Sequence, residues 1–199
     1  MDASNLQTFN VDNDSLIPLF TVMIFTETKF TKVYLIDIER LEDERGFFAR
    51  SFCEHEFLKH GLPTRFVQSN ISYNKKRGVL RGLHMQMAPF EEGKLVRCSR
   101  GAVHDVIVDL RKHSQTYKQW LAMELSAANG RMIYIPEGFA HGFITLTDDT
   151  EVVYQMTRFY QPGSERGYRW NDPAFGIKWP FDPLIISEKD KYYPLLENA

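Results

Sequence analysis

Short apolar stretches follow one another along this chain, and residues that form turns separate them. From about residue 29 onward these stretches are rich in Val, Ile, Phe and Tyr, and Gly, Asn, Pro or Asp separates them. Branched and aromatic side chains pack well on a pleated surface, so the pattern is typical of β-strands. Many short strands with frequent turns predict an all-β sandwich or barrel. The strands that we expect lie within 32–40, 45–52, 65–74, 78–87, 94–111, 119–126, 131–138 and 142–160.

Helices are expected at only two places. Residues 53–61 predict one short helix, ended by Gly61 and Pro63, because glycine favours a helix end and proline cannot continue the helix. Residues 187–198 predict one or two helical turns after a proline-rich connector. With 199 residues and no internal repeat, the chain is most simply one domain with a substantial core.

The first residues are set apart from this pattern. The apolar run 16–25 contains Pro18 and is too short to span a membrane, and the residues before it include no Lys or Arg. A secretory signal needs a basic start, so we expect neither a signal peptide nor a membrane anchor. We expect residues 1–22 to be a disordered or loosely packed extension, with Met23 as an alternative start, and residues 23–199 to form the domain.

Charge and cysteine content narrow the class of protein. The formal net charge is −2, so the chain lacks the basic excess that is typical of nucleic-acid binding. Cys53 and Cys98 form no CxxC pair and are typical of reduced thiols. We therefore expect a cytoplasmic protein that binds neither nucleic acid nor membrane.

Two glycine-containing polar segments resemble the two halves of the cupin signature. The segment PEGFAHGF at 136–143 contains Pro-x-Gly-x-x-His, and RGLHMQMAPFEEGKLVRCSRG at 81–101 contains a histidine, acids and flanking glycines. The second histidine of the first half is replaced by Gln86. A lone strand histidine is more often a structural residue than a catalyst, so the neighbours of His84 decide its interpretation.

These polar residues allow two interpretations, a metal site or a substrate cavity. The candidate metal ligands are two imidazoles and a carboxylate: His84, His141 and Glu91 or Glu92. Glutamine is a weak ligand, however, and Lys94 close to a cation would be electrostatically unfavourable. Without a metal, Glu91 and Glu92 are most simply loop acids. If instead Arg81, His84 and Gln86 line the interior of a barrel, their burial is costly unless they contact a ligand or each other. Such a cavity suits a small anionic or polyhydroxylated substrate.

A more specific resemblance comes from motifs spread along the chain. In order, they are DERGFFARSF, VLRGLHMQ, GKLVRCSRGAVHDVIVDLR, LSAANGRMIYIPEGFAHGF, VVYQMTRFYQP and WNDPAFGIKWP. In this order and spacing they resemble the dTDP-4-dehydrorhamnose 3,5-epimerase family, from about Met23 to about residue 197. The resemblance implies a cupin-type jelly roll, a homodimer, and catalysis without metal or cofactor. The implied reaction is epimerisation at C3 and C5 of a nucleotide-linked 4-dehydro-6-deoxyhexose.

The resemblance also implies catalytic roles. His84 would be the general base and Asp190, in the SEKD segment, its partner. Lys94 would stabilise the developing enolate, and Tyr154 would deliver a proton from the opposite face. These residue types suit the chemistry, because a cation aimed at a ketone oxygen stabilises the charge left by proton removal. An imidazole that titrates near neutrality suits the abstraction, and a carboxylate on its other nitrogen fixes the tautomer.

Each of these residues also has a purely structural interpretation. Asp190 lies three residues after Ser187, so SEKD resembles a helix start with a capping-box acid. Tyr154 alone is more often a packing residue of a sheet, and Lys94 a solvated strand lysine. His141 is expected to contact the substrate or to support the site.

The resemblance further implies contacts to the nucleotide diphosphate and the sugar, because the planar guanidinium of arginine suits phosphate oxygens. The residues implied are Arg45, Phe48, Gln68, Asn70, Arg81, Gln86, His141 and Lys189. Three positions depart from the family pattern. Arg50 stands where the rhamnose enzymes commonly have Glu, Ser69 replaces the Asp of QDN, and Phe159 replaces a tyrosine. We expect these departures to cluster around the nucleotide pocket and to bear on thymidine specificity.

Other functions stay open at this point. A single-carbon epimerase acting on a CDP-linked 4-keto-6-deoxy sugar is the nearest alternative. A metal-dependent cupin, such as a dioxygenase or a phosphosugar isomerase, comes from another class. A third alternative, a sugar-nucleotide-binding cupin without activity, is disfavoured because the four proposed catalytic residues occur together.

Overall fold

The computed structural model describes residues 22–198 and confirms the predicted all-β fold. The expected N-terminal extension therefore lies, apart from Val22, outside the described residues. The strands are β1 (Met23–Glu27), β2 (Tyr34–Ile38), β3 (Leu41–Asp43), β4 (Gly46–Phe48), β5 (Gln68–Asn74), β6 (Val79–Gln86), β7 (Lys94–Arg100), β8 (Ala102–Asp109), β9 (Trp120–Ser126), β10 (Met132–Ile135), β11 (Phe139–Thr145), β12 (Thr150–Met156), β13 (Glu165–Gly167) and β14 (Ile185–Ile186).

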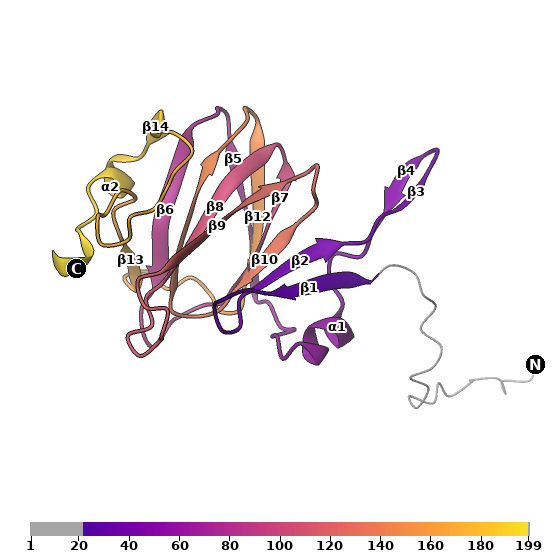
Figure 1. Ribbon diagram of the computed structural model, residues 1–199, viewed down its shortest axis with the longest axis horizontal. Helices are drawn as coiled ribbons and strands as arrows, with labels where there is room; N and C mark the ends of the chain where they lie inside the picture. The colour runs from indigo at the N-terminus through magenta and orange to yellow at the C-terminus, as the bar shows by residue number, and fades with distance from the viewer. Residues whose placement is uncertain (1–21, 199) are drawn as a thin grey trace, which may run out of the picture.

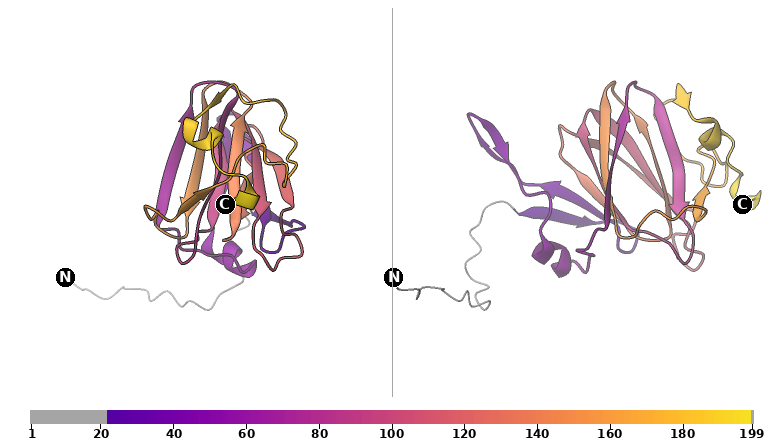
Figure 2. Two further views of the ribbon diagram at one scale, coloured as in Figure 1. Left: turned by 90° about the vertical axis from the view of Figure 1, so that its left-hand side faces the viewer. Right: turned by 180° about the vertical axis from the view of Figure 1, so that it is seen from behind.

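Two sheets face each other in the arrangement of a jelly roll (Figure 1, Figure 2). The first sheet has the strand order β1-β2-β10-β7-β12-β5 and the second has the order β13-β6-β11-β8-β9. Neighbouring strands along both orders are antiparallel, and β14 adds to β6 in parallel. Sequence neighbours are often separated within a sheet, so segments far apart in the chain meet between the two sheets.

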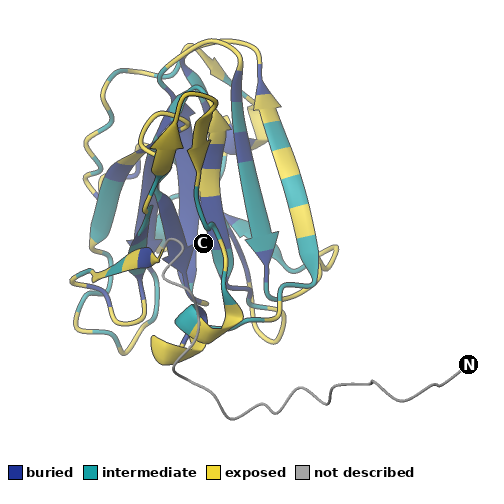
Figure 3. Ribbon diagram, turned by 90° about the vertical axis from the view of Figure 1, so that its right-hand side faces the viewer, coloured by how far each residue is buried: buried dark blue, intermediate teal, exposed yellow. Residues whose placement is uncertain are grey.

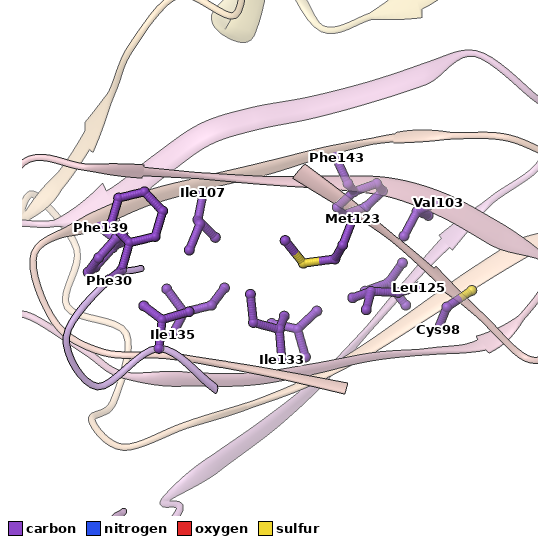
Figure 4. Packing of buried hydrophobic residues seen from close by; sticks show 13 residues of the cluster. Phe30, Cys98, Val103, Ile107, Met123, Leu125, Ile133, Ile135, Phe139 and Phe143 are labelled. Carbon is purple, nitrogen blue, oxygen red and sulfur yellow. The ribbon is translucent and has the colours of Figure 1, made fainter. Parts of the chain in front are cut away.

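The main hydrophobic core fills the space between the sheets (Figure 4). Successive side chains of a strand point to opposite faces, and β11 shows the consequence. Phe139 and Phe143 face this core, whereas Ala140 packs on the outer side of the second sheet. His141 lies between the two phenylalanines with the same parity, so the alternation directs it between the sheets as well.

Both outer faces of the sandwich are partly covered. Helix α1 (Glu54–Lys59) packs Phe57 against the first sheet, and the C-terminal segment packs Tyr168 and Phe175 against the second. The predicted helix within 53–61 is thus confirmed. The predicted turns within 187–198 are confirmed as α2 (Glu188–Lys191) and the 3₁₀ turn η1 (Leu196–Asn198).

One hairpin stands away from the sandwich. Within residues 22–198, strands β3 and β4 pair only with each other, and they project from the body of the protein (Figure 1). Both strands are exposed along their whole length, as Figure 3 shows. The stretch 45–52, expected as one strand, forms only β4 at its start. Among the described residues, no helix is long and apolar enough to cross a membrane.

Candidate active site

A pocket of about 690 Å³ opens between the sheets. Strands β5, β7 and β12 of the first sheet form one wall, and β6 and β11 of the second sheet form the other. The structure brings together most of the site residues expected from the sequence. Those that line this pocket are Gln68, Asn70, Arg81, His84, Gln86, Lys94, His141 and Tyr154.

An irregularity in β6 places both Arg81 and His84 in the pocket. Residues three apart on a regular strand point to opposite faces. The register with β11 shifts between these two residues, as in a β-bulge, so that both side chains reach the same side. Gly82 lies in the shift with φ 126°, and an added β-carbon there would lie 2.5 Å from Cα of Gly142. Only glycine fits this conformation and this close approach.

The same irregularity joins β6 to the C-terminal segment through Asp190. Its Oδ1 lies 2.7 Å from Nε2 of His84, and its Oδ2 accepts a hydrogen bond from the Gly82 N–H at 3.1 Å. Burial alone would raise the pKa of Asp190, but the hydrogen bonds from His84 and Gly82 hold it below its ordinary value. Asp190 is therefore an ionised partner for the imidazole.

Asp190 also belongs to a helix start, as its alternative interpretation predicts. Ser187 is the N-cap of α2, and its Oγ accepts a hydrogen bond from the Asp190 N–H at 3.1 Å. The two interpretations are compatible, since the cap uses the backbone of Asp190 and His84 uses its side chain. Capping fixes the backbone from which the carboxylate reaches His84.

Lys94 and Tyr154 lie on the wall opposite His84. They come from the adjacent strands β7 and β12, where Lys94 pairs with Met156 and Tyr154 with Val96. The two side chains are therefore diagonal neighbours on the inner face. Burial raises the pKa of Tyr154, Arg81 opposes this effect and Glu92 adds to it. The phenol thus keeps its proton at neutral pH.

Glu92 corrects one expectation. The sequence suggests that Glu91 and Glu92 are simple loop acids, but Glu92 is buried and lines the pocket. Its Oε1 lies 2.9 Å from Nζ of Lys94, whose side chain is only 11% exposed. The other oxygen, Oε2, has no hydrogen-bond partner among the described residues.

His141, like His84, pairs with the carboxylate of an aspartate. Its Nε2 lies 2.8 Å from Oδ2 of Asp105, which is completely buried. His141 pairs across the strands with His84, so two histidine–aspartate pairs lie side by side on the second sheet. His84, His141 and Glu92 are thus each engaged by a different partner. Within residues 22–198, no cluster of His, Cys, Asp or Glu side chains is arranged to hold a metal ion.

Two other predicted polar residues differ in how far the protein itself occupies their hydrogen-bonding groups. The Gln86 amide accepts from Gln161 N–H at 2.7 Å and Ser164 Oγ at 3.1 Å and donates to Phe90 O at 3.0 Å, so it braces two loops. Arg81 donates only from Nε, to Oδ1 of Asn74 at 2.8 Å, which leaves its terminal nitrogens without a hydrogen bond to the described residues.

Several predicted residues lie outside this pocket. Arg45 and Phe48 lie on the projecting hairpin, where the Arg45 side chain is 84% exposed and pairs with Asp43. Lys189 pairs instead with Glu165 of the pocket wall at 2.7 Å.

The three departures from the family pattern also lie outside the pocket lining of their own chain. Arg50 pairs with Glu56 at 2.7 Å. Ser69 lines a smaller pocket that includes Arg97, and Phe159 is exposed. Their grouping around one nucleotide pocket stays a prediction.

Sequence reasoning gave several residues of the pocket no role in substrate binding or in the metal-free reaction. Glu92, Tyr160 and Glu165 all line the cavity. Burial raises the pKa of Glu165, but Lys189 and His84 outweigh this effect and lower it overall. Glu165 reaches the site because β13 pairs with β6, a long-range pairing for which the sequence carries no local signal.

Comparisons with known proteins agree with this geometry. Residues 27–198 match the model of the family described as dTDP-4-dehydrorhamnose 3,5-epimerase. The enzyme of that name from Salmonella typhimurium is 47% identical over 180 residues, which cover 89% of this chain and 98% of that protein.

Solved structures of similar proteins carry nucleotide ligands. The dTDP-4-dehydrorhamnose 3,5-epimerase of Bacillus anthracis, solved with TDP and PPi bound, has a TM-score of 0.85 and 43% identity, covering 88% of this chain and 100% of that one. The dTDP-6-deoxy-D-glucose-3,5-epimerase of Legionella pneumophila, solved with dTDP-4-keto-L-rhamnose, has a TM-score of 0.83 and 39% identity. That match covers 88% of this chain and 94% of that one.

The glycine contact predicts a test of the site's framework. Gly82→Ala should lower the free energy of unfolding by about 1 to 3 kcal/mol more than Gly46→Ala, measured by chemical denaturation. Gly46 is a matched control, since its φ is 128° but nothing lies within 4 Å of an added β-carbon. Equal losses for the two variants would show that the approach of β6 to β11 does not constrain the fold.

Proposed function

Because the chain belongs to the dTDP-4-dehydrorhamnose 3,5-epimerase family, we propose that its pocket epimerises dTDP-4-dehydro-6-deoxyglucose at C3 and C5 to give dTDP-4-dehydrorhamnose. The protein is an isomerase of the rhamnose biosynthetic type. One observation carries the mechanism: His84, supported by Asp190, faces Lys94 and Tyr154 across a single pocket. A base and an acid on opposite walls suit the inversion of a carbon held between them.

The first step removes a proton from the carbon next to the C4 ketone. His84 takes this proton on the ring nitrogen that does not contact Asp190. The C–H electron pair forms a C=C bond to C4, and the carbonyl electrons move onto oxygen. Lys94 donates a hydrogen bond to that oxygen, and the ionised Asp190 stabilises the imidazolium. A positioned base of this kind contributes roughly a hundred- to ten-thousand-fold to the rate.

The second step returns a proton to the opposite face. Tyr154 donates its phenolic proton to the carbon, the electrons on oxygen restore the ketone, and the carbon is inverted. Water then reprotonates Tyr154 and accepts the proton from His84. The raised pKa of Tyr154, caused first by burial, keeps the phenol protonated before this step. C3 and C5 both adjoin the ketone, so one set of residues serves both carbons.

The reaction needs no further reagent in this scheme. The substrate and product are isomers, and each proton that is removed is replaced, so no electrons are gained or lost. We therefore propose an enzyme without metal or cofactor. The two cysteines, both free in the structure, support a reducing cytoplasmic location.

The nucleotide contacts require a second copy of the chain. Arg81, Gln68 and Asn70 line the pocket and suit the diphosphate and base as donors and acceptors. Arg45 and Phe48 sit on the hairpin that projects from the body of the protein, and neither lines the pocket of its own chain. We propose that the protein is a homodimer in which this hairpin reaches the pocket of the partner. Exposed Phe47 and Phe48 would be covered in such an arrangement.

Solvent exchange tests the proposed reaction. In D2O, the wild-type protein should place deuterium at both C3 and C5 of dTDP-4-keto-6-deoxyglucose, read by NMR, and should act far less on the CDP-linked sugar. His84→Ala should slow this exchange roughly a hundred- to ten-thousand-fold. His55→Ala, an exposed histidine of α1, serves as the control and should exchange normally. Exchange at full rate in His84→Ala, or none in the wild type with either nucleotide, would refute the proposal.

Mixed dimers test the shared pocket. A variant with both Arg45→Ala and Phe48→Ala, and a His84→Ala variant, should each be nearly inactive alone. Dimers containing one chain of each should regain activity, because one of their two pockets then has both an intact base and an intact hairpin. The measurement is the epimerisation rate of co-expressed, doubly tagged dimers. A mixed dimer no more active than its parents would contradict the shared site.

A further inference from the structure

The proposed mechanism leaves one buried charge of the pocket without a role. The Glu92 side chain is only 4% exposed, and its Oε1 lies 2.9 Å from Nζ of Lys94. Its Oε2 makes no hydrogen bond to the described residues. A buried carboxylate is costly unless it is paired, and the same holds for a buried ammonium. The ion pair between Glu92 and Lys94 therefore offsets part of the free-energy cost of burying each charge.

The backbone beside Glu92 is firmly anchored. The Gly93 N–H donates to Oγ1 of Thr157 at 2.8 Å, and the Thr157 N–H donates to the Gly93 carbonyl at 3.0 Å. A β-carbon at Gly93 would lie only 2.7 Å from the hydroxyl of Tyr134, so the segment packs closely against β10. These contacts fix the point from which the Glu92 carboxylate reaches Lys94.

We propose that Glu92 is the positioning residue of Lys94, holding its ammonium group so that the remaining N–H bonds meet the ketone oxygen of the sugar. The inference rests on the proposed function, because it places that oxygen at Lys94. A lysine ammonium has three N–H donors, and the ion pair with Glu92 occupies one side of the group. Its other side is left to donate to the oxygen on which charge develops.

The physical need for such a partner comes from the lysine itself. Lysine carries its charge on a flexible four-carbon stem. If that stem rotated freely, the N–H groups would not stay directed at the ketone oxygen. A donor stabilises an enolate best when it is aligned before the charge forms. The negative charge of Glu92 offsets part of the lysine's attraction for the enolate. The pair therefore favours the reaction by fixing the orientation of the Lys94 N–H donors, and not by adding positive charge to the pocket.

Glu92 acts on Tyr154 as well. The pocket around Tyr154 is also lined by eight other charged or titratable groups of the described residues. They are Tyr73 on β5, Arg81 and His84 on β6, Glu92, Lys94 on β7, His141 on β11, Tyr160, and Glu165 on β13. After burial and the opposing effect of Arg81, the charge of Glu92 raises the pKa of Tyr154. Removing that charge should lower this pKa, so the phenol would lose its proton at a lower pH.

Two substitutions separate the charge of Glu92 from its position. Glu92→Gln should lower kcat about 10- to 100-fold, less than the roughly 100- to 1,000-fold loss typical of removing such a donor outright. KM should change less, and the high-pH decline of kcat should begin at lower pH. Glu92→Asp keeps the negative charge in the pocket but moves the carboxylate away from Lys94, because the side chain is one methylene shorter. We therefore expect kcat to fall while the decline of kcat at high pH stays at the wild-type pH. The readout is deuterium exchange into dTDP-4-keto-6-deoxyglucose over a range of pH.

The control is Glu91→Gln, which removes the same charge one residue away, outside the pocket lining. It should match the wild type in both rate and pH profile. The inference is wrong if Glu92→Gln keeps the wild-type kcat and pH profile, or if Glu92→Asp moves the high-pH decline as far as Glu92→Gln does.

Thermal unfolding provides a readout that does not depend on turnover. Glu92→Gln and Lys94→Met should each lower Tm, and the double variant should lose less than the sum of the two. Simple additivity would show that Glu92 does not hold Lys94. A wild-type protein that exchanges no deuterium but shows this coupling would overturn the proposed function while leaving the ion pair in place.

Discussion

The site depends on the two hydrogen bonds that the Asp190 carboxylate accepts. One comes from His84 and the other from the backbone of Gly82, so a single side chain fixes both the base and the irregular turn of β6 that presents it. Ser187 caps the short helix that carries Asp190. The last segment of the chain thereby becomes part of the catalytic wall, although it lies outside both sheets of the sandwich.

Around this contact, the pocket contains polar and charged side chains that are paired within the protein. Lys94 pairs with Glu92, His141 with Asp105, and Arg81 with the side chain of Asn74. Buried polar groups without partners would be costly, so these pairs allow a polar cavity to exist between two hydrophobic layers. The pairs also leave some donors free, notably the terminal nitrogens of Arg81, to meet an anionic ligand.

The sequence predicts much of this arrangement, because strand alternation and turn residues act locally. The strand pattern within 142–160 predicts most of β11 and β12, and the SEKD pattern correctly predicts a helix start at Ser187. The predicted strand begins one residue after His141, so the place of His141 on β11 between two core phenylalanines is not predicted. What could not be predicted depends on long-range contacts. The sequence predicts Glu92 as a loop acid, because its ion pair with Lys94 depends on how the loop folds back. Glu165 joins the site only through the pairing of β13 with β6. The projection of the β3–β4 hairpin likewise has no local signal.

Inversion of the carbon depends on a base and an acid that lie on opposite walls of one pocket. Tyr154→Phe tests it most directly, by measuring deuterium incorporation and the configuration of the labelled carbons together in D2O. With Tyr154 absent and His84 intact, deuterium should still enter at C3 and C5 with retained configuration, while formation of the epimerised product falls sharply. Epimerised product at the wild-type rate would rule out Tyr154 as the acid, because the proton on the second face would then come from another group.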